Sequence, residues 1–169
     1  SNGTGTTLTK SNFIKIVDPD RISYTEDFEN SFPPAEWEIV NPDNKLTWEK
    51  RADAGHNSSS CMVMNNADND KVGAIDEIIL KPVDMSVGIT DFSFDIAYAK
   101  FDAESPDVLE VLASTDCGAN WKTVYVKTHT ELETFVSTDP NNWIPTSDSH
   151  WRTERILLTE FKGSSNVLF

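Results

Sequence analysis

Two carboxylates at the start of the chain are placed to share a cation. Asp27 and Glu29 lie on either side of Phe28 within the run 25–30. Alternate side chains of a strand point to opposite faces, so this spacing puts both carboxylates on one side and turns Phe28 to the core. Carboxylate oxygens are the ligands that Ca²⁺ prefers in proteins. Asp27 and Glu29 are therefore predicted metal ligands at a strand edge.

A second oxygen-rich loop follows at residues 41–44 and contains Asn41 and Asp43. Asn41 and Asp43 are therefore further predicted metal ligands, again for a structural calcium ion. A third loop, 65–70, has the composition of a calcium loop but lacks the Gly and distant Glu of an EF-hand. Asn and Asp are also common in ordinary solvated turns, which is the alternative for each loop and the reading we favour for the third.

Tryptophans offer a different kind of site. Trp143 and Trp151 flank the polar loop 144–150, where exposed indoles would stack on a sugar or on a protein partner. They are the predicted ligand-binding residues. The alternative is that the rings fill the core, and we expect this of at least three of the five: Trp37, Trp48, Trp121, Trp143 and Trp151.

Catalytic patterns are missing from the sequence. It contains no HExxH helix, no GxSxG elbow and no glycine-rich phosphate loop. The histidines His56, His129 and His150 lie in polar stretches, and Cys117 has no His nearby in sequence. We therefore expect a non-catalytic chain. The two cysteines, Cys61 and Cys117, permit one disulfide, and the sequence leaves their pairing open.

Period-two alternation dominates the middle and end of the chain and predicts half-buried strands. Phe92, Phe94, Ile96 and Tyr98 alternate with smaller or polar residues. The runs 108–114 and 121–127 are separated by the turn-forming residues 115–120 and predict a hairpin. Further strands are expected at 153–158 and 166–169, and a short helical turn at 130–135. Residues 75–80 are an apolar run closed by Pro82. Many short strands with polar connections predict an all-β, antiparallel sandwich.

The composition of the chain argues against two classes of partner, nucleic acid and the membrane interior. The formal net charge is −14 and the pI about 4.4, so the field of the protein repels nucleic acid. No run of about 18 apolar residues is present, which argues against membrane insertion. A surplus of carboxylates suits calcium, although acidity also serves solubility alone.

The sequence also resembles a known group of modules. The pattern Glu26-Asp27-Phe28-Glu29-Asn30 through Pro34, Trp37, Asn41-Pro42-Asp43 and Trp48 resembles the opening of the MAM-like jelly-roll modules of secreted Bacteroidetes proteins, including cleaved-adhesin and choice-of-anchor type domains. The stretches 94–99, 109–121 and 151–154 are similar to the module found behind the catalytic domain of pappalysin-like zinc metallopeptidases. The resemblance implies a jelly-roll β-sandwich of two antiparallel sheets.

The resemblance also divides the chain. Residues 7–17 look like the terminal strand of a polycystic-kidney-disease (PKD) repeat, so 1–18 are expected to be the last strand and linker of a preceding domain. Residues 19–169 are expected to form the jelly roll, truncated at its C-terminus because Val167, Leu168 and Phe169 make an unfinished apolar strand. The family pattern continues with an Asp that is a calcium ligand in such jelly rolls, so Asp27 and Glu29 amount to half a site.

These arguments together predict an accessory or adhesion module. It would belong to a secreted or cell-surface multidomain protein, a metalloprotease, and would bind an extracellular protein or glycan as a monomer. The alternatives are a carbohydrate-binding module and a purely structural spacer.

Overall fold

The computed structural model describes residues 25–68, 72–88, 91–102, 104 and 107–169. The expected PKD strand, 1–18, lies outside them. The described residues form eight strands: β1 (Glu38–Val40), β2 (Glu49–Arg51), β3 (Cys61–Val63), β4 (Glu77–Ile79), β5 (Asp91–Ile96), β6 (Val108–Ala113), β7 (Lys122–Thr128) and β8 (Arg152–Leu157). The helical elements are short: η1 (Asn66–Asp68), η2 (Met85–Val87), α1 (His129–Leu132), η3 (Pro140–Asn142), η4 (Asp148–His150) and η5 (Thr159–Phe161).

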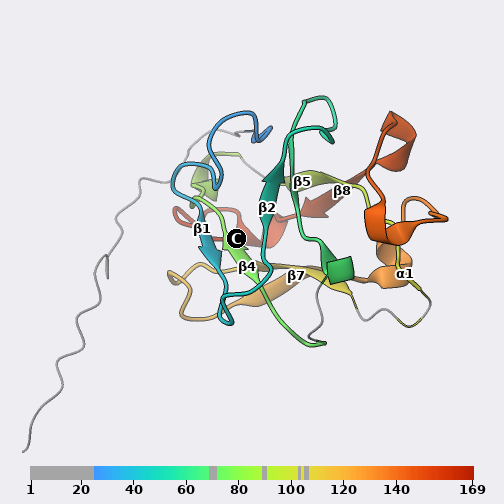
Figure 1. The fold of residues 1–169 in the computed structure, drawn as a ribbon. Coiled ribbons are helices and arrows are strands. Elements are labelled where there is room, and N and C mark those ends of the chain that lie inside the picture. The colour runs from blue at the N-terminus through green and yellow to red at the C-terminus, as the bar shows by residue number, and fades with distance from the viewer. Residues whose placement is uncertain (1–24, 69–71, 89–90, 103, 105–106) are drawn as a thin grey trace, which may run out of the picture.

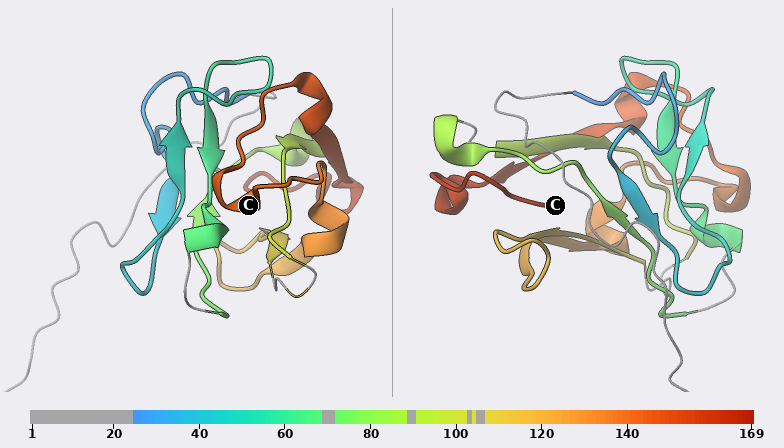
Figure 2. Two further views of the ribbon diagram at one scale, coloured as in Figure 1. Left: turned by 45° about the vertical axis from the view of Figure 1, so that its right-hand side comes forward. Right: turned by 90° about the vertical axis from the view of Figure 1, so that its left-hand side faces the viewer.

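All strands pair antiparallel, as predicted. β1 pairs with β4, β2 with β3, β5 with β8, and β6 with β7. The two longest ladders, β5–β8 and β6–β7, form opposite layers (Figure 1), and the side view in Figure 2 shows the C-terminal segment between them. The structure thus confirms an all-β antiparallel sandwich, whose hydrogen bonding divides it into two-stranded ladders.

The predicted alternation along β5 is confirmed by its packing. Phe92 and Phe94 pack against the buried core, whereas Ser93 and Asp95 are exposed. The Phe94 ring meets the edge of Tyr125 in the opposite layer, with centroids 5.4 Å apart. β5 therefore presents one face to the core and one to solvent, as a strand at a sandwich surface must.

The predicted hairpin joins β6 to β7 through a turn whose residues form hydrogen bonds with one another. Asp116 Oδ1 accepts from the Ser114 hydroxyl at 2.8 Å and from the Asn120 backbone N–H at 2.8 Å. Gly118 has φ +82°, a left-handed conformation that favours glycine. These short polar residues satisfy the turn locally, which explains why the sequence alone located it.

The last residues close the sandwich. Val167 forms a β-bridge with Val83, and Leu168 forms one with Ser114. The segment 166–169 therefore pairs with two separate parts of the chain. The Phe169 ring stacks on Phe92 at 5.4 Å. The predicted final strand is thus present as two isolated bridges.

Helix contributes little to the fold. α1 overlaps the helical turn predicted at 130–135, begins one residue earlier and buries Leu132. No helix in the described part of the chain is long and apolar enough to cross a membrane.

Two residues of η2 provide a matched test of the core. Met85 is 0% exposed and belongs to the central cluster, whereas Val87, two residues later, is 59% exposed. We expect Met85→Ala to lower the free energy of unfolding by about 2–5 kcal/mol because it leaves a cavity, and Val87→Ala by less than about 0.5 kcal/mol. Urea denaturation measures both. Equal effects would contradict the assigned core.

Candidate functional site

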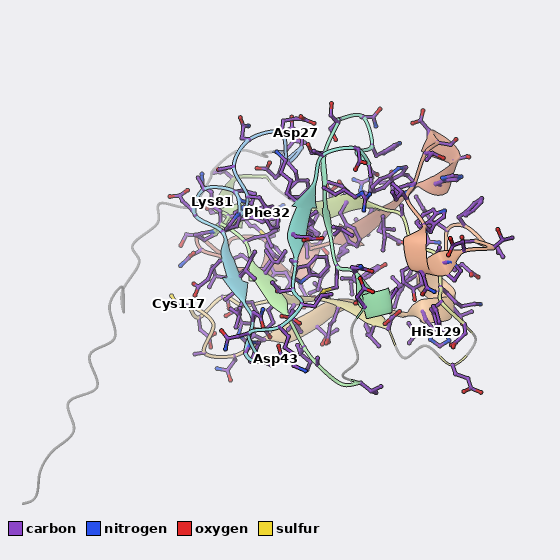
Figure 3. The ribbon with its side chains drawn as sticks, viewed as in Figure 1. Asp27, Phe32, Asp43, Lys81, Cys117 and His129 are labelled. Carbon is purple, nitrogen blue, oxygen red and sulfur yellow. The ribbon has the colours of Figure 1, made fainter. Side chains whose placement is uncertain are left out.

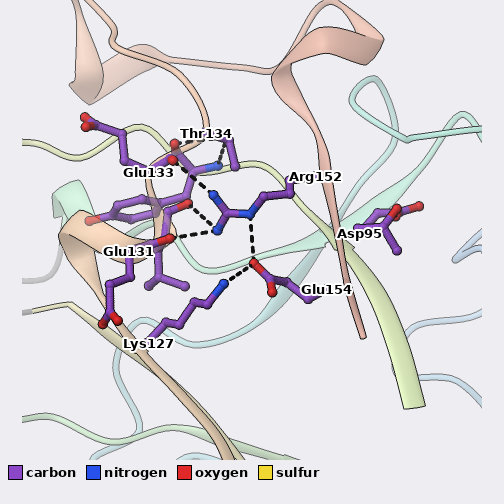
Figure 4. A network of polar contacts seen from close by, with 10 residues as sticks. Asp95, Lys127, Glu131, Glu133, Thr134, Arg152 and Glu154 are labelled. Atoms are coloured by element: carbon purple, nitrogen blue, oxygen red, sulfur yellow. Dashed lines mark hydrogen bonds and ion pairs between the residues drawn. The ribbon is translucent and has the colours of Figure 1, made fainter. Parts of the chain in front are cut away.

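A long loop between α1 and β8, residues 133–151, carries both predicted ligand-binding tryptophans. Its base is closed by Arg152, the first residue of β8. The Arg152 guanidinium donates to the carbonyl oxygens of Glu131 at 2.8 Å, Leu132 at 3.4 Å and Glu133 at 3.3 Å (Figure 4). These carbonyls end α1 and have no partner within so short a helix, so the guanidinium satisfies them.

Glu154 holds the guanidinium in position. Its Oε1 accepts from Arg152 Nε at 2.8 Å and from Lys127 Nζ at 2.6 Å. Although burial by itself raises the pKa of a carboxyl group, the hydrogen bonds from Lys127 and Arg152 hold the pKa of Glu154 below its ordinary value. The stabilisation from Glu154 is therefore fully present above the unfolded-state pKa of about 4.3 and is lost as pH falls through the folded-state pKa.

A second anchor holds the start of the loop to the end of β5. The backbone N–H of Thr134 donates to the Tyr98 carbonyl at 2.9 Å, and the Tyr98 N–H donates to the Thr134 hydroxyl at 2.9 Å. The Tyr98 hydroxyl in turn donates to Asp107 Oδ2 at 2.6 Å. The loop thus leaves and rejoins the sandwich at fixed points.

Beyond these anchors the loop builds an aromatic cluster. Phe135 stacks on Trp143 with centroids 5.7 Å apart and an interplanar angle of 13°, and His150 lies 4.3 Å from Phe135 and 5.6 Å from Trp143. Phe135 is 38% exposed and the adjacent Val136 is 76% exposed. The cluster is therefore an apolar patch at the surface and not an extension of the core.

Two hollows lie on either side of this loop. The first, about 320 Å³, lies between the loop and residues 52–59 and is lined by Trp151. The second, about 500 Å³, is lined by the aromatic cluster, including Trp143. Thr146 lines both. Each predicted ligand-binding tryptophan therefore lines a hollow of its own, a few residues from the other.

Trp151 is held by a small polar assembly. His56 stacks on its indole with centroids 5.6 Å apart and an interplanar angle of 17°. His56 Nδ1 lies 2.8 Å from Asp95 Oδ2, and the Thr153 hydroxyl donates to Asp95 Oδ1 at 2.5 Å. Burial opposes ionisation of Asp95, but the bonds from Thr153 and His56 lower its pKa. Sequence reasoning missed His56, because its partners, Asp95 in β5 and Trp151 just before β8, are distant in the sequence.

The prediction that at least three tryptophans are buried in the core is wrong. Trp37, Trp48, Trp143 and Trp151 are half-buried, and Trp121 is 39% exposed. None is fully buried, although we expected at least three to fill the core. The central cluster is built from aliphatic side chains, Met85 and phenylalanines, and no indole of the described residues belongs to it or packs against it.

The strand predicted at 25–30 is also wrong. These residues form no strand, and Phe28 adopts a left-handed φ of 60°. Asp27 Oδ1 accepts from the Glu29 N–H, so its carboxylate caps a local turn. Glu29 Oε1 accepts from the N–H groups of Ser59 and Ser60 at 2.5 and 2.9 Å. The two carboxylates therefore do not share a strand face.

Asn41 and Asp43 lie within one turn. Asn41 Nδ2 donates to the Lys45 carbonyl at 2.9 Å, and Asp43 Oδ1 accepts from the Lys45 N–H at 3.0 Å. Figure 3 places Asp27 and Asp43 at opposite ends of the molecule in that view, so the four predicted ligands do not form one coordination sphere. Among the described residues, no three His, Cys, Asp or Glu side chains gather as a metal site.

Sequence reasoning singled out Asn41 but not Thr47 or Asp76, and each of the three carries a buried oxygen. Asn41 Oδ1, Thr47 Oγ1 and Asp76 Oδ1 have no hydrogen-bond partner among the described residues. The register of β1 with β4 pairs Val40 with Glu77, so Asn41 and Asp76 are the next opposed positions. The indole N–H of Trp48, the residue after Thr47, donates to the Asp76 carbonyl at 3.2 Å.

The cysteines are both free. Cys61 lies in β3, where burial raises the pKa of its thiol, and Cys117 is exposed in the β6–β7 turn. The disulfide that the sequence permitted is not formed.

Arg152 and Arg155 on β8 test the anchor of the loop. Arg155 is 65% exposed and pairs with Asp91 at 3.0 Å, whereas Arg152 satisfies three carbonyls and a buried carboxylate. We expect Arg152→Met to lower the free energy of unfolding by about 2 kcal/mol, because the buried Glu154 carboxylate and the carbonyl oxygens at the end of α1 lose a donor, and Arg155→Met by about 0–1 kcal/mol. Denaturant titration of both variants measures the difference. An Arg155 effect as large as that of Arg152 would remove the special role of the anchor.

No protein-family model matches the chain, and no curated protein does. Two solved structures are similar to it. The K2 cleaved adhesin domain of Lys-gingipain is 21% identical, with a TM-score of 0.60 over 86% of this chain and 87% of that one. The K3 cleaved adhesin domain of Lys-gingipain from Porphyromonas gingivalis W83 is 19% identical, with a TM-score of 0.58 over 85% of each chain. At these identities the likeness shows the fold: the chain has a β-sandwich like that of the cleaved adhesin domains.

Proposed function

We propose that the chain is a non-catalytic adhesion-type module of a secreted or cell-surface protein, and that it binds an extracellular macromolecule through the face formed by residues 133–151. The observation that carries this proposal is the pair of hollows on the two sides of one anchored loop, each lined by a tryptophan. Half-buried aromatic side chains on a firmly held loop are typical of recognition surfaces. The shared fold with cleaved adhesin domains supports the same function.

The sandwich supplies the rigidity that such a module needs. Arg152 and Thr134 fix the two ends of the loop. The loop therefore loses little conformational entropy when a partner binds. The wider setting is also part of the proposal. The resemblance of 7–17 to a PKD strand and of 94–154 to metallopeptidase-associated modules supports a multidomain parent protein, a metalloprotease, in which this monomeric domain engages the substrate or a surface.

Carbohydrate binding is the main alternative within the same face. Trp143 and Phe135 form a stacked aromatic surface on which the apolar side of a sugar ring would lie. A structural spacer, the other alternative, would need neither hollow. Binding measurements on glycans and on extracellular proteins separate the three.

Two exposed valines test the face. Val136 lines the second hollow and is 76% exposed, and Val87 is 59% exposed in η2, outside both hollows. We expect Val136→Ser to weaken binding of the chain to immobilised extracellular-matrix proteins and a glycan array, because it removes apolar contact area, and Val87→Ser to leave binding unchanged. Surface plasmon resonance measures both. Binding that is equal for the two variants would reject this face, and no binding to any target would favour the spacer.

A structural calcium ion is a second proposal, supported by the unpaired oxygens of Asn41, Thr47 and Asp76. They supply an amide, a hydroxyl and a carboxylate oxygen, the hard donors that Ca²⁺ takes. The Asp27 and Glu29 end is a weaker candidate, because the ammonium of Lys50 already binds the carbonyl oxygens of Glu29 and Asn30 at 3.0 and 2.9 Å. Of the predicted ligands, Asn41 is the one that the geometry favours.

Calcium binding can be tested at both candidate sites, the oxygens of Asn41, Thr47 and Asp76 and the carboxylates of Asp27 and Glu29. We expect EDTA to lower the melting temperature by several degrees, because the ion would bind only the folded state. Asp76→Asn should abolish that shift and the Tb³⁺ luminescence sensitised by the nearby Trp48, whereas Glu29→Gln should keep both. A melting curve that EDTA leaves unchanged would reject the ion, and loss of the signal in Glu29→Gln alone would place it at the other end.

A further inference from the structure

We propose that the hollow beside Trp151 binds a cationic side chain, an arginine in a basic segment of a protein partner. This inference rests on the proposed function and names the chemistry of its partner. It comes from the charges, the aromatic ring and the size of the hollow, each of which restricts the occupant.

The charge of the lining is entirely negative. Asp53 and Asp148 line the hollow, and no Lys or Arg among the described residues does. Asp148 is exposed and makes no side-chain hydrogen bond or ion pair with the described part of the chain. Asp53 accepts from Arg51 Nε at 2.9 Å, yet its side chain remains 69% exposed. Because the whole chain carries a formal charge of −14, its electrostatic field attracts a cation to this hollow and repels an anionic ligand.

The ring of Trp151 adds a surface that favours a planar cation. Tryptophan is the aromatic side chain with the strongest attraction for cations. Its indole is stacked on His56, which Asp95 holds at 2.8 Å, so its orientation is fixed before any ligand arrives. A guanidinium can lie flat on an aromatic ring and direct its N–H groups to a carboxylate, which a lysine ammonium cannot do in the same way. This favours arginine over lysine.

The size of the hollow fits one side chain. Its volume of about 320 Å³ is at the lower end of the range for ligand pockets. The hydroxyls of Ser58, Ser59 and Ser147 line the rest of it and accept hydrogen bonds from remaining N–H groups. A single sugar ring would also fit and would also stack on tryptophan. Charge therefore distinguishes arginine from a sugar as the ligand, because the negative field strengthens the binding of a cation and leaves that of a neutral sugar unchanged.

The experiment compares three probes on the intact chain by isothermal titration calorimetry: a capped Gly-Arg-Gly peptide, the same peptide with citrulline, and a neutral oligosaccharide, cellotetraose. Citrulline keeps the shape of arginine and removes its charge. We expect the arginine peptide to bind about tenfold more tightly than the citrulline peptide, the factor that a desolvated cation–π contact supplies. Binding should also weaken as salt rises.

Two variants localise the effect. Asp148→Asn is expected to remove most of the preference for arginine over citrulline. The matched control is Glu38→Gln, an exposed carboxylate on β1, which lies on the opposite side of the molecule from the loop in Figure 1 and should keep the preference. Asp148 is exposed, so its variant is expected to fold, and its melting temperature confirms this.

The outcomes separate this inference from the proposed function. Equal binding of both peptides, or a preference that survives Asp148→Asn, overturns the arginine site. Binding of cellotetraose without the arginine peptide overturns it too, while leaving the face a recognition surface. If none of the probes binds but the valine variants still differ in binding to immobilised targets, the arginine site is wrong and the proposed face stands.

Discussion

The bonds from the Arg152 guanidinium to the end of α1 are the constraint on which the proposed recognition face depends. Residues 133–151 contain no strand, and a loop of that length would sample many conformations if only its chain ends were fixed. One side chain joins the first residue after the loop to the carbonyl oxygens just before it, and Glu154 and Lys127 keep that side chain oriented. The aromatic cluster and both hollows are therefore built on a closed base.

The sandwich beneath provides the platform. β8, which carries Arg152 and Glu154, pairs with β5, which carries Asp95, so the anchor and the His56–Asp95 contact come from one ladder. The C-terminal segment bridges Val83 and Ser114 and fills the space between the layers. The core thus fixes the strands, and the loop that carries the proposed binding face lies outside that core.

The sequence alone predicted what depends on local pattern. Alternation located β5 and β8, and the turn residues between β6 and β7 located the hairpin, because each of these follows from periodicity or from hydrogen bonds between near neighbours. Trp143 and Trp151 were singled out by their position around a polar loop, and each lines a hollow.

Features made by distant residues escaped prediction. The left-handed φ of Phe28 breaks the strand expected around it, and Glu29 turns to amides thirty residues away at Ser59 and Ser60. The stack of His56 on Trp151 joins residues almost a hundred positions apart. Periodicity contains no information on such contacts, so they appear only in the folded chain.

The indole N–H signals of the five tryptophans in a ¹H–¹⁵N NMR spectrum test the dependence of the face on Arg152 most directly. In the folded Arg152→Met variant, the signals of Trp143 and Trp151 should shift or broaden because the loop loses its base, and those of Trp37, Trp48 and Trp121 should stay in place. Five unchanged signals would show that the loop is held by something else and would contradict the account.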